Sequence, residues 1–148
     1  MNTEVASRNF IVDASRERIW RLIGKVIFSS LPGMEEVEIE DDRSFHAFLR
    51  VKVLLLELRM KLNGEIVDMA PPDSLAVTIN LDGLRGLFKM KQKVTIDITF
   101  VETRRTGVTC KTMAEGMGIL SRVFFLGQAR HFAQLTFEAI EKRLKELA

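Results

Sequence analysis

Two histidines and one cysteine are the side chains of this 148-residue chain best suited to acid–base or nucleophilic chemistry. His46 falls on the outward side of a predicted strand, beside Arg50 and Lys52, which is typical of a solvated surface histidine. His131 lies near the apolar stripe of a predicted long helix, so it is the better candidate for a polar contact inside the molecule. Cys110 alternates with apolar residues, which indicates a small core residue. One cysteine and two distant histidines cannot supply the ligands of a metal site.

Gln92 is the one polar side chain among the inward apolar positions of its predicted strand. A buried amide must find partners, which could be backbone, water or the polar head of a bound molecule. Serine or cysteine nucleophiles with a base at a recognisable spacing are not found, and Gly83 with Gly86 is too short a motif for a phosphate cradle. The acidic pairs 35–36 and 41–42 are interpreted as solvated groups. The sequence therefore predicts no catalytic site, no metal and no cofactor.

The charge of the chain is nearly balanced, with 22 basic and 20 acidic residues and a formal net charge of +2. This balance, with the basic residues scattered along the chain, argues against a nucleic-acid partner. The N-terminal residues lack the basic and apolar regions of a signal peptide, and a single cysteine allows no intramolecular disulfide. The most apolar window, around residues 116–126, is too short to cross a bilayer. We therefore expect a cytoplasmic protein.

Two helical regions flank a long run of predicted strands. After a first strand at residues 5–12, apolar residues at helical spacing predict a helical region up to about residue 29, with Asp13 or Ser15 as its N-cap. Gly24 is expected to divide this region into two short helices. Residues 117–148 predict one long amphipathic helix with His131 and Leu135 on its inward side.

Between these helical regions the apolar period changes from 3.6 to 2. Six consecutive strands, separated by turns such as 41–43, 70–74 and 102–107, predict an antiparallel meander with one apolar face. The expected fold is therefore α+β, in a single domain over residues 1–148. It is a curved antiparallel sheet of about seven strands, with two short helices after the first strand and the long C-terminal helix over the concave face.

The inward positions of the strands and of the long helix form one predicted apolar surface. Such a surface can line a cavity for an apolar molecule or simply fill the core, because both need the same residue types. The candidate cavity residues are Phe45, Leu49, Leu58, Met60, Leu62, Val77, Ile79, Met90, Gln92, Val94, Thr112, Leu120, Phe124, His131 and Leu135.

Several short segments resemble a known family in their order along the chain. They are the run from Phe10 to Trp20 (FIVDASRERIW), the corner Leu31-Pro32-Gly33-Met34-Glu35, the segment Asn63-Gly64-Glu65-Ile66, and Gly118 with Gly127 in the long helix. This order resembles the CoxG family, named after carbon monoxide dehydrogenase, within the START-like superfamily, also called SRPBCC or Bet v 1-like.

The resemblance implies a helix-grip fold whose cavity takes an apolar lipid or quinone. It also implies an accessory role in the maturation or membrane attachment of a molybdenum hydroxylase such as carbon monoxide dehydrogenase, with peripheral contact at the inner face of the membrane. Because of this resemblance, we favour a cavity over a filled core and a non-enzymatic binding protein over a catalyst.

Three alternatives remain open at this stage. An enzyme of the same superfamily, such as a cyclase or hydrolase, would use His131 and Gln92 as polar groups in the pocket. A pure interaction module would instead present the outward row Lys89, Lys91 and Lys93 to an acidic partner. A membrane contact would use the apolar start of the long helix, at residues 119–126, together with neighbouring arginines.

Overall fold

The computed structural model describes residues 3–29, 34–41, 43–53, 55–83, 88–117 and 119–148, without the side chains of residues 3, 28, 29, 51–53, 56, 88, 116, 117 and 119–128. The elements are β1 (Thr3–Val12), α1 (Arg16–Ser29), β2 (Met34–Ile39), β3 (Ser44–Val53), β4 (Leu56–Ala70), β5 (Ser74–Gly83), β6 (Phe88–Glu102), β7 (Arg105–Met117) and α2 (Ile119–Leu147).

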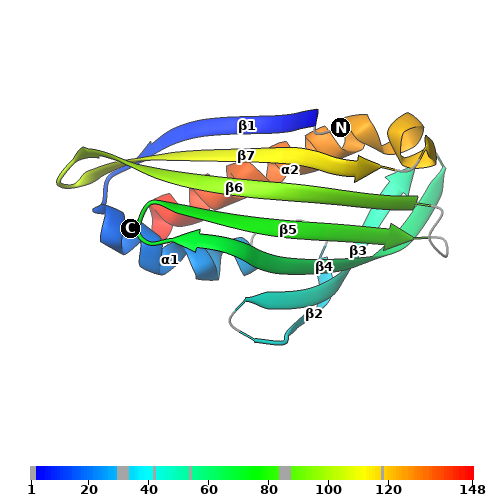
Figure 1. Ribbon diagram of the computed structural model, residues 1–148, viewed down its shortest axis with the longest axis horizontal. Coiled ribbons are helices and arrows are strands. Elements are labelled where there is room, and N and C mark those ends of the chain that lie inside the picture. The colour runs from blue at the N-terminus through cyan, green and yellow to red at the C-terminus, as the bar shows by residue number, and fades with distance from the viewer. Residues whose placement is uncertain (1–2, 30–33, 42, 54, 84–87, 118) are drawn as a thin grey trace.

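The seven strands form one antiparallel sheet in the order β1-β7-β6-β5-β4-β3-β2. Strands β2 to β7 follow each other as a meander, and β1 joins the far side of β7. Figure 1 shows the sheet curving, with both helices on the same face. The predicted α+β architecture with a C-terminal helix over the concave face is confirmed. Edge strands β1 and β2 are each bonded on one side only.

Helix α1 is a single helix of 14 residues, so the prediction of two short helices is wrong. Its N-cap is Ser15, whose Oγ accepts a hydrogen bond of 3.3 Å from the backbone N–H of Arg18. Gly24 lies inside the helix and does not break it. The cost of an internal glycine, about 1 kcal/mol relative to alanine, is offset by a buried apolar stripe on both sides of Gly24. This stripe is Ile19, Ile23, Val26 and Ile27.

Helix α2 packs on β1, β7 and β6 and against α1. Its buried residues recur at helical spacing and are Ala129, Ala133, Thr136, Phe137, Ile140 and Leu144. Arg8 on β1 reaches the helix, where its Nε lies 2.8 Å from Glu141 Oε1, and Arg18 Nη2 donates to the carbonyl of Leu147 at 2.7 Å. None of the helices over the described residues has an apolar stretch long enough to cross a membrane.

The predicted turn between β4 and β5 is confirmed. Asp73 N–H donates to the carbonyl of Ala70 at 2.7 Å, and the peptide bond between Pro71 and Pro72 is cis. The predicted corner at residues 31–33 lies outside the described residues. In the turn between β2 and β3, Asp41 Oδ1 accepts the backbone N–H groups of Arg43 and Ser44, each at 2.8 Å. These turns fix the strand register on which the candidate site depends.

Candidate functional site

The inner face of the sheet carries the predicted strand residues. Leu62 and Thr112 have no exposed surface, and Phe45 is 2% exposed. The buried members of the predicted set are Phe45, Leu49, Met60, Leu62, Val77, Ile79, Met90, Gln92 and Thr112, while Leu58 and Val94 are half-buried against the same core. The inward placement of these eleven sheet residues is confirmed. The alternation of each strand is responsible, because every second side chain points to the concave face.

Gln92 is the polar group of this apolar face and is 3% exposed. Its Nε2 donates to the sulfur of Met90 at 3.2 Å, and its Oε1 accepts the hydroxyl of Thr112 at 3.4 Å. A thioether is a weak acceptor, and 3.4 Å is long for an O–H···O bond. Among the described residues, no charged group is bonded to Gln92. The amide therefore keeps hydrogen-bonding capacity that weak neighbours use only in part.

The predicted contribution of α2 to the inner surface needs correction. His131 is exposed, and Leu135 is 40% exposed. Successive helical residues are about 100° apart, so a residue midway between buried Ala129 and Ala133 projects to the opposite side. Small alanines mark the face that approaches the sheet, and this face had been assigned to the larger residues. The side chains of Leu120 and Phe124, the other two predicted helix residues, lie outside the described part of the structure.

This correction separates the two groups of the enzymatic alternative. His131 is exposed and Gln92 is buried, so the structure does not bring them together as an acid–base pair. Cys110 is fully buried, as predicted for a core residue, and burial raises the pKa of its thiol to about 12. Within the described residues, no three His, Cys, Asp or Glu side chains come together as metal ligands.

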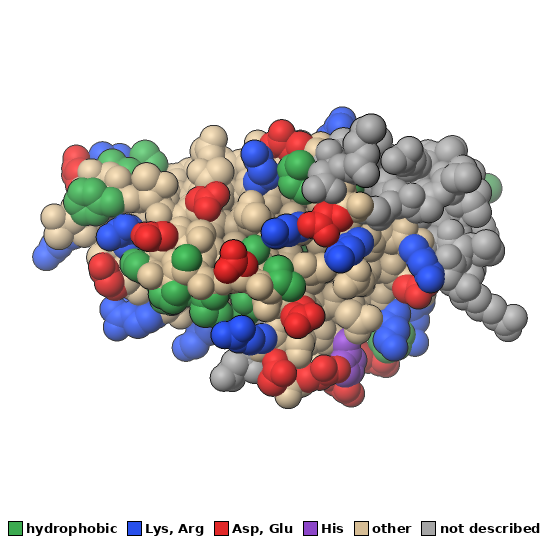
Figure 2. All heavy atoms as spheres, in the orientation of Figure 1, with side chains coloured by type: hydrophobic (Ala, Val, Ile, Leu, Met, Phe, Trp, Pro, Cys, Tyr) green, Lys and Arg blue, Asp and Glu red, His purple; other side chains and the backbone are tan. Residues whose placement is uncertain are grey.

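The two alternative contact surfaces fare differently. Lys89 and Lys91 are exposed on the outer face, where Lys91 Nζ lies 3.7 Å from Glu115 Oε2, and Lys93 is half-buried. Figure 2 shows that basic and acidic side chains alternate over this face. The apolar side chains proposed for membrane contact, at 119–126, lie outside the described part.

The sequence interpretation missed a cluster around His46. Its Nε2 lies 2.7 Å from Glu38 Oε2 and its Nδ1 lies 2.6 Å from Glu40 Oε1. The hydrogen bond to Glu38, followed by the one to Glu40, raises the pKa of His46 above its usual value. These side chains border a surface hollow of about 300 Å³, together with Glu36, Phe48, Lys61 and Asn63. The signal was present in the sequence, because a turn centred on residue 42 places Glu38 opposite His46.

A curved antiparallel sheet whose apolar concave face is covered by a long C-terminal helix defines the START-like, or helix-grip, class of proteins. Solved structures support this class. A conserved protein from Geobacillus kaustophilus matches with a TM-score of 0.74 at 19% identity, covering 99% of this chain and 96% of that one. A START superfamily protein from Mycobacterium smegmatis matches with a TM-score of 0.62 at 16% identity, covering 99% and 100%.

Truncated norcoclaurine synthase from Thalictrum flavum is also similar, with a TM-score of 0.59 at 16% identity over 96% of this chain and 92% of that one. These identities are low, so the three structures establish the fold alone. A search of curated proteins finds no match. The family model of CoxG, a component of carbon monoxide dehydrogenase, matches residues 9–123, and the chain belongs to the CoxG family.

Proposed function

We propose that this protein is a non-enzymatic accessory protein that binds a neutral apolar molecule, a lipid or a quinone, between the inner face of the sheet and α2. Membership of the CoxG family and the START-like fold support a ligand-binding accessory role. The inner face offers apolar side chains of adaptable shape, including Met60 and Met90, which suit an irregular apolar molecule.

The observation that carries the proposal is the weakly partnered amide of Gln92 on that face. An amide N–H is a good donor to a carbonyl oxygen, and lipids and quinones both carry one. A charged ligand group would need a counter-charge in this environment, and none is bonded to Gln92 among the described residues. The chemistry of the site therefore favours a neutral carbonyl head with an apolar body.

The physiological partner in this proposal is a molybdenum hydroxylase such as carbon monoxide dehydrogenase, with the protein acting at the cytoplasmic face of the membrane. The name of the family supports this partner. Affinity purification of the tagged chain from its native cells, followed by mass spectrometry of co-purified proteins, tests it. Recovery of the hydroxylase subunits is expected, and their absence from repeated preparations at low salt would contradict this part of the proposal.

The ligand is tested by purifying the protein in the presence of membranes, extracting it with organic solvent and identifying the extract by mass spectrometry. We expect a lipid or quinone at close to one molecule per chain. Gln92→Leu should weaken the binding of a short-chain quinone about fivefold to tenfold, because one hydrogen bond contributes about 1 kcal/mol. In the absence of ligand, the same variant should keep its free energy of unfolding within about 1 kcal/mol of wild type.

Asn80→Ala is the matched control, since Asn80 is an exposed amide on β5 and pairs with Lys91 on the neighbouring strand β6. This control should leave quinone binding unchanged. Protein that repeatedly carries nothing, together with equal quinone binding by wild type and Gln92→Leu, would refute the proposed ligand site.

A further inference from the structure

His46 lies between two carboxylates on the outer face of the sheet. Glu40 Oε1 is 2.6 Å from Nδ1 and Glu38 Oε2 is 2.7 Å from Nε2. Carboxylates accept hydrogen bonds, so each contact needs an N–H on the ring. A neutral imidazole has one N–H, whereas the charged ring has two. The geometry therefore requires a charged His46. Because the two nitrogens point away from each other, the carboxylates lie on opposite sides of the ring and cannot share one metal ion.

The carboxylates of this cluster belong to β2 and the region just after it, which forms an edge of the sheet. Every described residue of β2 is exposed or half-buried, and Ile39 is 63% exposed. The strand pairs only with β3, and one extra residue between Glu35 and Glu38 interrupts the pairing. Within this bulge Glu36 has φ of 50°, a conformation that costs a non-glycine residue energy. Little apolar burial therefore holds β2, and its side-chain bonds matter more than in the central strands.

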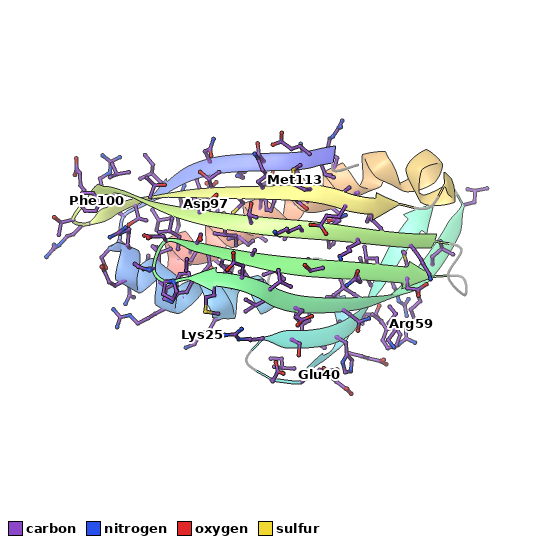
Figure 3. All side chains as sticks on the ribbon, viewed as in Figure 1. Lys25, Glu40, Arg59, Asp97, Phe100 and Met113 are labelled. Atoms are coloured by element: carbon purple, nitrogen blue, oxygen red, sulfur yellow. The ribbon has the colours of Figure 1, made fainter. Side chains whose placement is uncertain are left out.

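Three cations on the neighbouring strands pair with the carboxylates of this edge. Arg50 Nε lies 2.5 Å from Glu35 Oε1, Arg59 Nη2 lies 2.6 Å from Glu36 Oε2, and His46 contacts the other two glutamates. Figure 3 shows Glu40 and Arg59 near the edge that β2 forms. Arginine stays charged at every accessible pH, whereas histidine loses its proton near neutrality. His46 is therefore the one cation among these three pairs that titrates in the physiological range.

The other charged groups around His46 come from β2 and β4. Glu36 and Lys61 border the same hollow, and Asn63, the neutral partner of His46 across β4, is flanked on its own face by Lys61 and Glu65. Lys61 opposes the charge of the ring, while Glu36, Glu38, Glu40 and Glu65 favour it. The direct contacts to Glu38 and Glu40 dominate because they are hydrogen bonds to the ring itself.

We propose that Glu38, His46 and Glu40 form a pH-sensitive latch that holds edge strand β2 on β3 while His46 is charged and loosens β2 when His46 loses its proton. After deprotonation, one carboxylate faces a ring nitrogen that carries a lone pair, so one of the two bonds is lost. The strand that loosens contains the cross-strand neighbours of two buried inner-face residues, because Ile39 pairs with Phe45 and Met34 pairs with Leu49. Loosening would open the apolar inner face at this edge of the sheet.

The direction of the pH effect follows from the raised pKa of His46. A group whose pKa is higher in the folded protein stabilises it fully below the unfolded value, near 6.5. This contribution is lost as the pH rises through the folded value. The latch is therefore closed in mildly acidic and neutral solution and opens toward alkaline pH. The inference stands on the geometry of the outer face and does not require the ligand proposed above.

Hydrogen exchange and NMR titration test the latch. The His46 ring should titrate above 6.5, and the protection factors of β2 amides bonded to β3 should fall as the pH passes that value. The fall should not exceed about tenfold per pH unit, the limit for one proton. Amides of central strand β5 are the internal reference. In His46→Gln, β2 protection should be low and independent of pH relative to β5.

Glu38→Gln and Glu40→Gln supply a second measurement that keeps the ring in place. Each should lower the pH at which His46 titrates and shift the loss of β2 protection to the same lower pH. A ring that titrates at or below 6.5 in wild type would overturn the latch. The same conclusion would follow if β2 protection kept its wild-type pH dependence in His46→Gln.

Discussion

The ring of Phe45 on β3 lies against the backbone of Gly64, its antiparallel partner on β4. A Cβ placed on Gly64 would be 2.7 Å from Phe45 Cζ, far closer than two carbon atoms approach without repulsion. Phe45 is one of the largest fully buried side chains of the inner face. A glycine in the middle of a strand normally weakens it, but here the missing side chain makes room for an aromatic ring.

Gly64→Ala should therefore lower the free energy of unfolding by about 1–3 kcal/mol, as expected for overpacking of a buried site. Urea denaturation followed by circular dichroism measures the change. Combining Gly64→Ala with Phe45→Leu should cost less than the sum of the two single changes, because the smaller side chain vacates the space that the new methyl needs. Strictly additive costs would show that the ring and the methyl do not compete.

Gly24→Ala is the matched control in α1 and should have the opposite effect. An added Cβ at Gly24 meets no atom within 4 Å, so the gain in helix propensity is not offset by a clash. The free energy of unfolding should rise by about 0.5–1 kcal/mol. A decrease in the same urea experiment would mean that α1 needs the flexibility of glycine at this position and that the one-helix description is incomplete.

The strand faces were readable from the sequence because their alternation has a period of 2 and leaves no choice of face. Leu62 and Val77 had to point inward once their strands were recognised. The face of α2 was harder to read, because apolar residues occur on several sides of the helix. Large residues such as Leu135 suggested the buried side, whereas the sheet contacts Ala129 and Ala133. Close approach favours small side chains, and the spacing of apolar residues does not reveal it.

The candidate site was readable in part. Gln92 stood out as the polar member of an apolar alternation, and burial confirms its placement. Its bond to Thr112 was not readable, because the register shifts between Lys91 and Gln92 and makes Thr112 the direct partner of Val94. Similarly, the position of His46 on an outward face was predicted correctly, but its two carboxylate partners depend on the register of a bulged hairpin.

Arg8 should stabilise the contact between β1 and α2. The ammonium of Lys145 and then the guanidinium of Arg8 lower the pKa of Glu141, whose carboxylate bonds both cations at 2.8 Å. Arg8→Met should reduce the free energy of unfolding at pH 7 by up to about 1 kcal/mol, a modest amount because the Arg8 side chain is 40% exposed. A lowered pKa contributes stability above the unfolded value that is lost as the pH falls through the folded one. The deficit should therefore shrink in acid.

Arg143→Met is the control for this change, since Arg143 is on the same helix and makes only a 3.7 Å contact with Glu146 at its surface. Its effect on unfolding should be close to zero at every pH. A deficit of Arg8→Met that persists unchanged at pH 3 would assign the contribution of Arg8 to packing of its aliphatic stem instead of to its charge.

Cys110 should be unreactive in the folded protein. It is fully buried on β7, and desolvation raises the pKa of its thiol to about 12, so only about one molecule in ten thousand would carry a thiolate at pH 8. An aromatic disulfide reagent should label less than a few per cent of native chains within an hour at pH 8, in the regime of exchange through opening. In guanidinium chloride, the same reagent should titrate one thiol per chain within minutes. Rapid labelling of the native protein would mean that β7 or the elements covering it open readily, which would also give an apolar molecule a route to the inner face.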